Sequence, residues 1–262
     1  MNHKLIFLDI DGTLTEAGKN VPPASAIDAI RRAQQAGHKV VLCSGRNYGM
    51  LRPLLEYHFD GIIGSAGGYI EYEDKVIYNC PMTPAQQEKV LTCLAENGVF
   101  RTIEGKMGSF VDESFKEFLH TRVSEGANSE LLRWREQLES SLNIRPMKEY
   151  DGETIYKVVF ACPSIDNLKV PQAELGDEFN FCIQDPDPFG LINGELINKQ
   201  FNKGTAVRRM AEAAGIPMSD TIAFGDSMND LEMIETAALG ICMENGSETL
   251  KQHADEVCPA VD

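Results

Sequence analysis

Residues 6–18 read IFLDIDGTLTEAG, and the interpretation of the whole chain depends on this stretch. Four apolar residues, Leu5 to Leu8, lead directly into Asp9 and, one residue further on, Asp11. A short apolar run of this kind is typical of a buried strand in a parallel sheet. Two carboxylates one residue apart repel each other at neutral pH. Their position at the end of a strand therefore calls for a chemical reason.

The composition restricts the class of protein. The chain has 262 residues, enough for two domains, with 43% hydrophobic residues and a formal net charge of −16. Such an acidic surface repels nucleic acids and anionic membranes, so we expect neither as a partner. A small anionic substrate would need a local positive site. The oligomeric state is left open by these features.

The N-terminus and the cysteines favour a cytoplasmic protein. A run of only four apolar residues leads up to Asp9, too few for the apolar region of a secretory signal. No apolar run approaches the roughly 18 residues of a membrane span. The seven cysteines form no CxxC pair. We therefore expect reduced thiols, and neither a disulfide framework nor a zinc site.

Strand and helix signals alternate at both ends of the chain. Apolar runs predict strands at 4–9, 39–44, 61–68, 221–226 and 238–243, with helices between them. A hairpin is expected at 69–79, with its turn at Glu73-Asp74. This alternation predicts an α/β fold, a Rossmann-like parallel sheet with helices on both faces.

The middle of the chain has a different pattern. From about residue 83 to about 190, predicted helices (84–97, 129–140, 164–174) mix with alternating strands such as 154–161 and 179–184. We interpret this stretch as a second, α+β domain inserted into the first. The predicted core is then 1–82 plus 190–262, and the inserted domain is 83–189.

Candidate catalytic residues follow the predicted strands. In open α/β sheets, ligands bind beyond the carboxyl ends of the strands. Asp9 and Asp11 lie at such an end, residues 44–46 follow the second strand, residues 225–230 follow another, and Lys203 begins a helix. A set of ligands made only of oxygen atoms suits Mg²⁺.

These groups suit phosphoryl transfer. A carboxylate can attack phosphorus and form an aspartyl phosphate. A second carboxylic acid can protonate the leaving oxygen and then deprotonate water. Mg²⁺ and a lysine neutralise the charge of the transition state. A serine hydroxyl and backbone N–H groups can bind the phosphate.

DIDGTL, CSGR, NKG and GDSMND, in this order, resemble the four motifs of the haloacid dehalogenase-like hydrolases. The long insert between the second and third motifs is similar to the cap domain of the Cof-like branch of that family. The resemblance covers essentially the whole chain. It implies a Mg²⁺-dependent phosphatase that acts through an aspartyl phosphate, most often on a sugar phosphate, with a cap domain that governs specificity.

The resemblance also implies a role for each motif residue. Asp9 would be the nucleophile and a Mg²⁺ ligand. Asp11 would be the general acid and base, with its main-chain carbonyl on the metal. Lys203 would hold the phosphate and the nucleophile together, and Asp226 would bind Mg²⁺ directly.

The remaining motif residues would bind phosphate or support the site. Ser44 and the N–H group of Gly45 would bind the phosphate, and Asn229 would contact it. Asp230 would act indirectly, on a metal-bound water or on Lys203. For Arg46, a contact with phosphate or the cap and a surface salt bridge both remain open.

Other functions remain open at this point. A phosphomutase would use the same aspartyl phosphate but pass the phosphoryl group to a second substrate hydroxyl. A phosphoacceptor signalling module also combines an acceptor aspartate with an acidic pair, a hydroxyl and a lysine. Such a module is much shorter than this chain and lacks the carboxylate two residues after the acceptor. A silent binding protein is disfavoured because every chemical position is filled.

Overall fold

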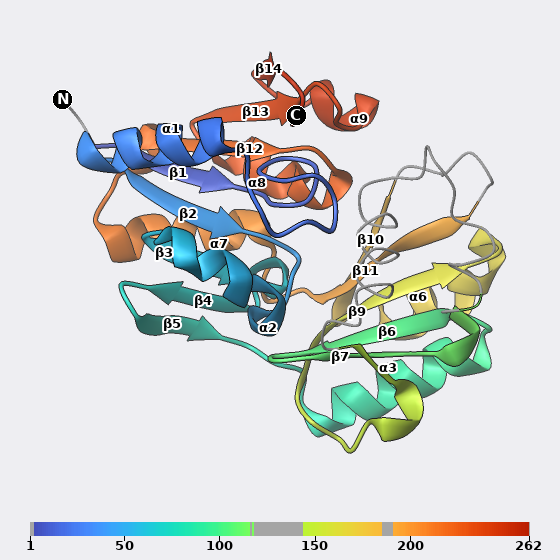
Figure 1. Cartoon of the computed structure of the whole chain (residues 1–262). Coiled ribbons are helices and arrows are strands. Elements are labelled where there is room, and N and C mark those ends of the chain that lie inside the picture. The colour runs from blue at the N-terminus through green and yellow to red at the C-terminus, as the bar shows by residue number, and fades with distance from the viewer. Residues whose placement is uncertain (1–2, 116, 118–143, 185–190, 262) are drawn as a thin grey trace. The chain divides into compact units, whose positions relative to one another are not determined.

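The chain divides into two compact units, Met1–Asn79 with Phe201–Asp262 and Cys80–Gln200 (Figure 1). The computed structural model describes residues 3–115, 117, 144–184 and 191–261. The predicted helix at 129–140 lies outside these residues. Among the described residues, no helix combines the length and apolar character needed to cross a membrane.

The first unit is built on an eight-stranded sheet with the order β14-β13-β12-β1-β2-β3-β4-β5. The strands that run parallel are β1 (Leu5–Leu8), β2 (Lys39–Cys43), β3 (Gly61–Gly64), β12 (Thr221–Gly225), β13 (Leu239–Met243) and β14 (Glu256–Cys258). The predicted hairpin forms β4 (Tyr69–Tyr72) and β5 (Lys75–Asn79), which extend the sheet in antiparallel fashion. Since β1 lies between β12 and β2, the carboxyl ends of these three strands are neighbours.

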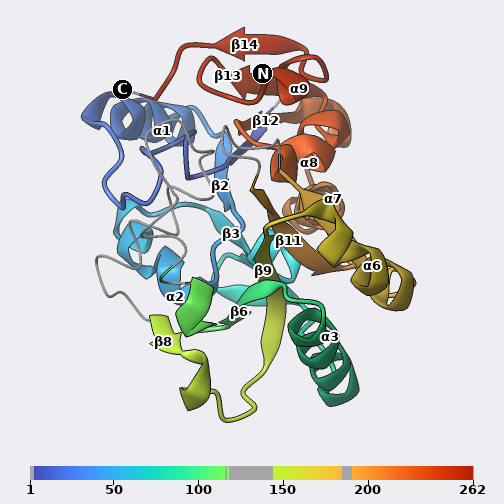
Figure 2. The ribbon, with the colours of Figure 1, turned by 90° about the vertical axis from the view of Figure 1, so that its right-hand side faces the viewer.

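Helices cover both faces of this sheet (Figure 2). Leu5 and Phe7 of β1 belong to a core with α7 (Lys203–Ala214) and α8 (Leu231–Thr236). Val40 and Leu42 of β2 belong to a core on the other face, with α1 (Ala24–Gln35), α2 (Tyr48–Leu51) and the 3-10 helix η1 (Arg52–Tyr57). The short helix α9 (Glu248–Lys251) follows β13. The predicted three-layer α/β architecture is confirmed.

The second unit has a six-stranded sheet with the order β10-β11-β9-β6-β7-β8. Its strands are β6 (Phe100–Gly105), β7 (Ser109–Val111), β8 (Ile144–Pro146), β9 (Ile155–Cys162), β10 (Phe179–Ile183) and β11 (Ile192–Asn198). Helices α3 (Pro84–Glu96) and α6 (Lys169–Leu175) pack on the face that carries Ile103, Val158 and Leu196. The described residues also form the 3-10 helices η2 (Ser65–Gly67), η3 (Met147–Glu149), η4 (Ile165–Leu168), η5 (Met218–Asp220) and η6 (Met228–Asp230).

The ends of the second unit differ from the predicted boundaries of 83 and 189. Strand β11 pairs with β9 and β10, so residues 192–198 belong to the second sheet and not to the core. At the other end, the N–H group of Met82 donates to the carbonyl of Ile155, 2.7 Å away. These backbone hydrogen bonds extend the second unit to residues 80–200.

The second sheet carries charged side chains on the face opposite its apolar core. Side chains alternate along a strand, so Thr102, Glu104, Lys157 and Glu195 lie opposite their core neighbours. All four are fully buried. The Lys157 ammonium lies 3.6 Å from a carboxylate oxygen of Glu104 and forms an ion pair with Glu195. We call these four residues the polar face of the second unit.

Candidate active site

The loops after β1, β2 and β12 bring the predicted catalytic residues to one edge of the first sheet. The turn after β1 depends on Gly12, which has a φ of +86° and lies against Asp226. A Cβ atom at residue 12 would lie 2.4 Å from Asp226 Oδ2. Glycine therefore permits both the left-handed backbone and the close approach of the two loops.

Lys203 links the residues of three motifs. Its Nζ donates to Asp9 Oδ1 at 2.7 Å, to Asp230 Oδ1 at 2.5 Å and to Asn229 Oδ1 at 3.3 Å. The side chain is only 1% exposed. Asn202 caps α7 by accepting from the N–H group of Thr205, which places Lys203 in the first turn. A cation at a helix N-terminus is unfavourable, and here the two carboxylates compensate for it.

Asp230 organises the loop after β12. Its Oδ2 accepts from the N–H groups of Asp226 and Ser227 at 3.0 and 3.1 Å, while its Oδ1 is paired with Lys203. The Ser227 hydroxyl donates to Asn229 Oδ1 at 2.9 Å. Asp230 therefore connects the loop after β12 to Lys203, which suits an indirect role in the site.

The site has an excess of negative charge. Carboxylate oxygens of Asp9, Asp226 and Asp230 lie within 4.8 Å of one another, and all three residues are buried. Burial first, and then the charge of Asp230, raise the pKa of Asp9 from 3.8 to about 8, against the opposing effect of Lys203. Burial alone would lower the pKa of Lys203, but Asp230 and Asp9 raise it well above the usual value. The cluster has three carboxyl groups and one ammonium group, that of Lys203, which pairs with Asp9 and Asp230.

This cluster fits a hard divalent cation, because its donors are all oxygen atoms and its three carboxyl groups outnumber the single ammonium group of Lys203. Asp9 Oδ2 has no hydrogen-bond donor among the residues that the structure describes. Asp226 is held in place by the Thr13 hydroxyl, which donates to its Oδ1 at 3.2 Å. The carboxylate of Asp11 is outside the cluster, as expected for a residue that would offer its main-chain carbonyl.

Mg²⁺ is expected to raise the unfolding temperature of the metal-free protein, because it would bind the folded cluster and relieve its repulsion. Asp226→Asn should remove most of this shift. Thermal unfolding with and without EDTA, and with added Mg²⁺, measures it without reference to activity. Equal stabilisation of the wild type and the variant by Mg²⁺ would place the cation elsewhere.

Asp11 is paired with Arg46. Arg46 Nε donates to Asp11 Oδ2 at 2.8 Å, and Arg46 Nη2 donates to Asp11 Oδ1 at 2.7 Å. The N–H group of Gly18 also donates to Oδ1, at 2.7 Å. Arg46 is completely buried, so the interpretation of this residue as part of a surface salt bridge is wrong.

Ser44 and Gly45 are buried at the carboxyl end of β2. The Ser44 hydroxyl oxygen accepts from the N–H group of Arg46 at 3.1 Å, and its proton is available for another acceptor. Ser44 is not a helix cap, because Asn47 caps α2 by accepting from the N–H group of Met50. The structure thus places both residues at the correct edge of the sheet, and their contact with phosphate stays a prediction.

Sequence reasoning missed two residues that support the site. Ser227 donates a hydrogen bond to Asn229. It lies inside the GDSMND motif, so the motif could have indicated a role for it. Asn245 donates from Nδ2 to the carbonyl of Gly12 at 2.7 Å, across 233 residues of sequence. No local pattern indicates such a contact, because it depends on the loop after β13 reaching the loop after β1.

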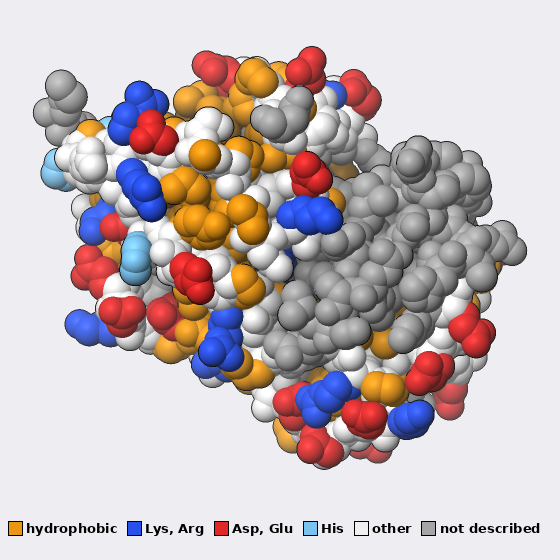
Figure 3. Space-filling model, in the orientation of Figure 1, with side chains coloured by type: hydrophobic (Ala, Val, Ile, Leu, Met, Phe, Trp, Pro, Cys, Tyr) orange, Lys and Arg blue, Asp and Glu red, His pale blue; other side chains and the backbone are white. Residues whose placement is uncertain are grey.

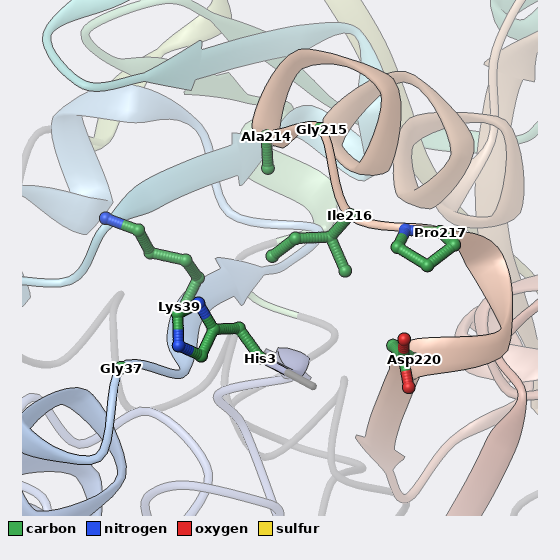
Figure 4. A pocket seen from close by; sticks show the side chains of 8 residues that line it. All are labelled: His3, Gly37, Lys39, Ala214, Gly215, Ile216, Pro217 and Asp220. Carbon is green, nitrogen blue, oxygen red and sulfur yellow. The ribbon is translucent and has the colours of Figure 1, made fainter. Parts of the chain in front are cut away.

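A separate depression of about 480 Å³ lies at the opposite edge of the same sheet, near the amino ends of β1 and β2 (Figure 4). Its charged side chains have partners: Asp220 is paired with Lys4 at 2.6 Å, and Lys39 with Asp60 at 3.0 Å. None of the predicted catalytic residues lines it.

On the face shown in Figure 3, Lys and Arg side chains are mixed with Asp and Glu side chains.

Comparisons with known proteins agree with this arrangement. The family model described as haloacid dehalogenase-like hydrolase matches residues 6–262. YkrA of Bacillus subtilis (strain 168), named as a candidate phosphatase, is 28% identical, with 100% of this chain and 94% of YkrA covered. The 5-amino-6-(5-phospho-D-ribitylamino)uracil phosphatase YwtE of the same organism is also 28% identical, over 99% of this chain and 94% of YwtE.

Solved structures share the fold. The sugar phosphatase BT4131, of haloacid dehalogenase subclass IIB, superposes with a TM-score of 0.76 at 21% identity, over 99% of this chain and 94% of that one. The family, its Cof-like branch and the fold class predicted from the sequence are confirmed. The chain belongs to the haloacid dehalogenase-like hydrolases.

Proposed function

We propose that the protein is a Mg²⁺-dependent phosphatase that hydrolyses a small phosphorylated metabolite through an aspartyl phosphate on Asp9. At the level of the enzyme class, the prediction of a phosphatase agrees with the family and its named members. The observation that carries the finer proposal is the buried ion pair at 2.7 Å between Asp9 and Lys203, set among further carboxylates.

In the first step, Asp9 attacks phosphorus, and the bond from phosphorus to the ester oxygen breaks. The departing alcohol takes a proton from Asp11. In the second step, water attacks the phosphorus of the aspartyl phosphate, Asp11 accepts the proton from water, and the Asp9 carboxylate is released with inorganic phosphate. Each residue returns to its starting state.

The other residues bind and orient the phosphate. Lys203 offers positive charge beside the nucleophile, and the Ser44 hydroxyl and the Gly45 N–H group donate to phosphate oxygens. Asp230 keeps Lys203 in place. Mg²⁺, held by Asp9, Asp226 and the Asp11 carbonyl, would supply further positive charge against the phosphate.

We assign recognition of the organic part of the substrate to the polar face of the second unit. A buried ion pair can usually be replaced by apolar residues at no loss of stability, so charges inside a sheet indicate another role. The face also holds a polar atom without a hydrogen-bond partner among the described residues, Thr102 Oγ1. Two carboxylates with one ammonium group suit hydroxyl groups, which donate to carboxylates, and repel a second anionic group.

The substrate is therefore a monophosphate whose organic part is rich in hydroxyl groups, such as a sugar or sugar alcohol phosphate. Phosphate release in the presence of Mg²⁺ tests this on ribose 5-phosphate, glucose 6-phosphate, phosphoglycolate, pyridoxal phosphate and AMP. The sugar phosphates should have the highest kcat/KM. A preference for phosphoglycolate, with its second anionic group, would contradict the assignment, and turnover without release of phosphate would indicate a mutase.

Glu195→Gln should lower kcat/KM for the preferred sugar phosphate by about tenfold or more, because a hydrogen bond to a charged group is worth roughly 1.5–3 kcal/mol. Hydrolysis of p-nitrophenyl phosphate, which has no hydroxyl groups, should change little. Glu178→Gln is the matched control, since Glu178 lies at the surface of the same unit with Gln86 and Lys89 as partners. An equal loss on both substrates would mean that Glu195 only supports the fold.

We also propose a cytoplasmic location. All seven cysteines are free thiols, and four of them, Cys43, Cys93, Cys162 and Cys242, are buried. Burial raises the pKa of the thiol of Cys162 to about 11 and that of Cys242 to about 11, which keeps them protonated and unreactive. Such thiols suit a reducing compartment.

A further inference from the structure

Arg46 is the largest of the fully buried side chains that the structure describes. A buried guanidinium group is costly unless it is paired and hydrogen-bonded. Here it has four hydrogen bonds: two to the carboxylate of Asp11, one from Nη1 to Asn20 Oδ1 at 2.6 Å and one from Nη2 to the carbonyl of Lys19 at 2.8 Å. The residue joins the motif after β2 to the loop after β1.

These contacts fix the orientation of Asp11. Two parallel N–H···O bonds between a guanidinium and a carboxylate set the plane of the carboxylate as well as its position. The backbone of Arg46 is itself anchored, because its N–H group donates to Ser44 Oγ at 3.1 Å and its carbonyl accepts from the N–H group of Ser65 at 2.8 Å. The fork that holds Asp11 is thus attached to the ends of β2 and β3.

The same contacts argue against a direct role of Arg46 in binding phosphate. A guanidinium group has five N–H donors. Four of them are used within the protein, by Asp11, Asn20 and Lys19. A phosphate-binding arginine instead presents two parallel donors to its ligand.

We infer that Arg46 is a positioning residue, which holds the carboxylate of Asp11 where it can exchange a proton with the leaving oxygen and with water. The inference rests on the proposed function, in which Asp11 is the general acid and base. Proton transfer requires hydrogen-bond distance and alignment, and a small displacement of the carboxylate lowers the rate strongly. Without Arg46, the carboxylate would lose both of these parallel hydrogen bonds.

The test compares kcat/KM for two esters of similar shape, phenyl phosphate and p-nitrophenyl phosphate, at saturating Mg²⁺. p-Nitrophenolate leaves without a proton, whereas phenolate benefits from one, so the ratio of the two values reports general acid catalysis. Asp11→Asn should lower this phenyl to p-nitrophenyl ratio strongly. Arg46→Met should lower the same ratio, on the order of tenfold, and Arg46→Lys, which keeps the charge without the fork, should lower it less.

The double variant Arg46→Met with Asp11→Asn should be no slower on phenyl phosphate than Asp11→Asn alone, because both changes remove one function. Arg52→Met, a change at an exposed arginine of η1, is the matched control and should leave the ratio unchanged. Both kcat/KM values are measured on the same preparation of each variant. Partial unfolding lowers both by the same factor, so their ratio is unaffected.

Equal loss on both esters in Arg46→Met, or a full additional loss in the double variant, would overturn the inference and leave the proposed function standing. If Asp11→Asn lowered kcat/KM by the same factor on both esters, the acid role of Asp11 would be overturned, and the inference with it. The two failures are therefore distinguishable.

Discussion

Asp9→Asn is expected to abolish turnover, by roughly 10⁴-fold or more, without disturbing the fold. An amide cannot attack phosphorus, so no aspartyl phosphate forms. The amide keeps the volume of the side chain and removes one of the carboxyl groups that crowd Lys203. Phosphate release and thermal unfolding of the metal-free protein measure the two effects.

Because the pKa of Asp9 is raised, Asp9→Asn should also change how the stability of the protein depends on pH. The carboxyl group has a pKa of about 8 when folded, against 3.8 as its usual value, so the folded state binds more protons between these values. Its contribution therefore lowers stability as pH rises from about 4 to about 8. Metal-free Asp9→Asn lacks this contribution and should lose less stability than the wild type over the same range.

Asp220→Asn is the matched control for Asp9→Asn. Asp220 is a buried aspartate of the same unit, paired with Lys4 at the opposite edge of the sheet. The same chemical change there should leave kcat unaltered and lower stability slightly. Activity that persists in Asp9→Asn would contradict the assignment of the nucleophile.

Lys203→Met should lower kcat by about 10²–10³-fold, the usual effect of removing one group that stabilises the charge of the transition state. It should also lower the free energy of unfolding by about 3–5 kcal/mol, because it leaves buried carboxylates without their cation. Added Mg²⁺ should restore part of the stability but not the activity. Chemical denaturation with and without Mg²⁺ separates these effects.

Lys251→Met is the control for this change. Lys251 forms an ion pair with the exposed Glu248 at 2.7 Å, three residues away on α9, and exposed pairs of this kind contribute little to stability. The variant should keep full activity. If metal-free Lys203→Met had the same free energy of unfolding as the metal-free wild type, the carboxyl groups of the cluster would not all be ionised together.

Much of the first unit and its site could be predicted because the signals are local. Each parallel strand beside the site is an apolar run that ends in a polar motif, and the topology of a parallel sheet brings such ends together. The sequence therefore predicts that Asp9 and Asp226 meet. Lys203 lies in the first turn of helix α7, and its ion pair with Asp9 depends also on where that helix begins.

The features that could not be predicted depend on contacts between distant segments. The Arg46–Asp11 pair joins residues 35 apart, and an arginine after a glycine has no pattern that indicates its partner. Lys157 interrupts an otherwise apolar strand, and only its neighbours on β6 and β11 explain why it is tolerated. Strand β11 lies next to the third motif in sequence, yet its backbone pairs with the second sheet.

The most direct test of the account is the identification of the phosphorylated residue during turnover. The enzyme would be mixed with its preferred sugar phosphate and Mg²⁺ and quenched in acid within milliseconds. Borohydride, which reduces an acyl phosphate to an alcohol, would then be added, and the peptide containing residues 5–18 analysed by mass spectrometry. We predict that Asp9 is converted to homoserine only when substrate is present. A phosphoryl group on another residue would contradict this prediction, as would turnover with Asp9 unmodified at every quench time.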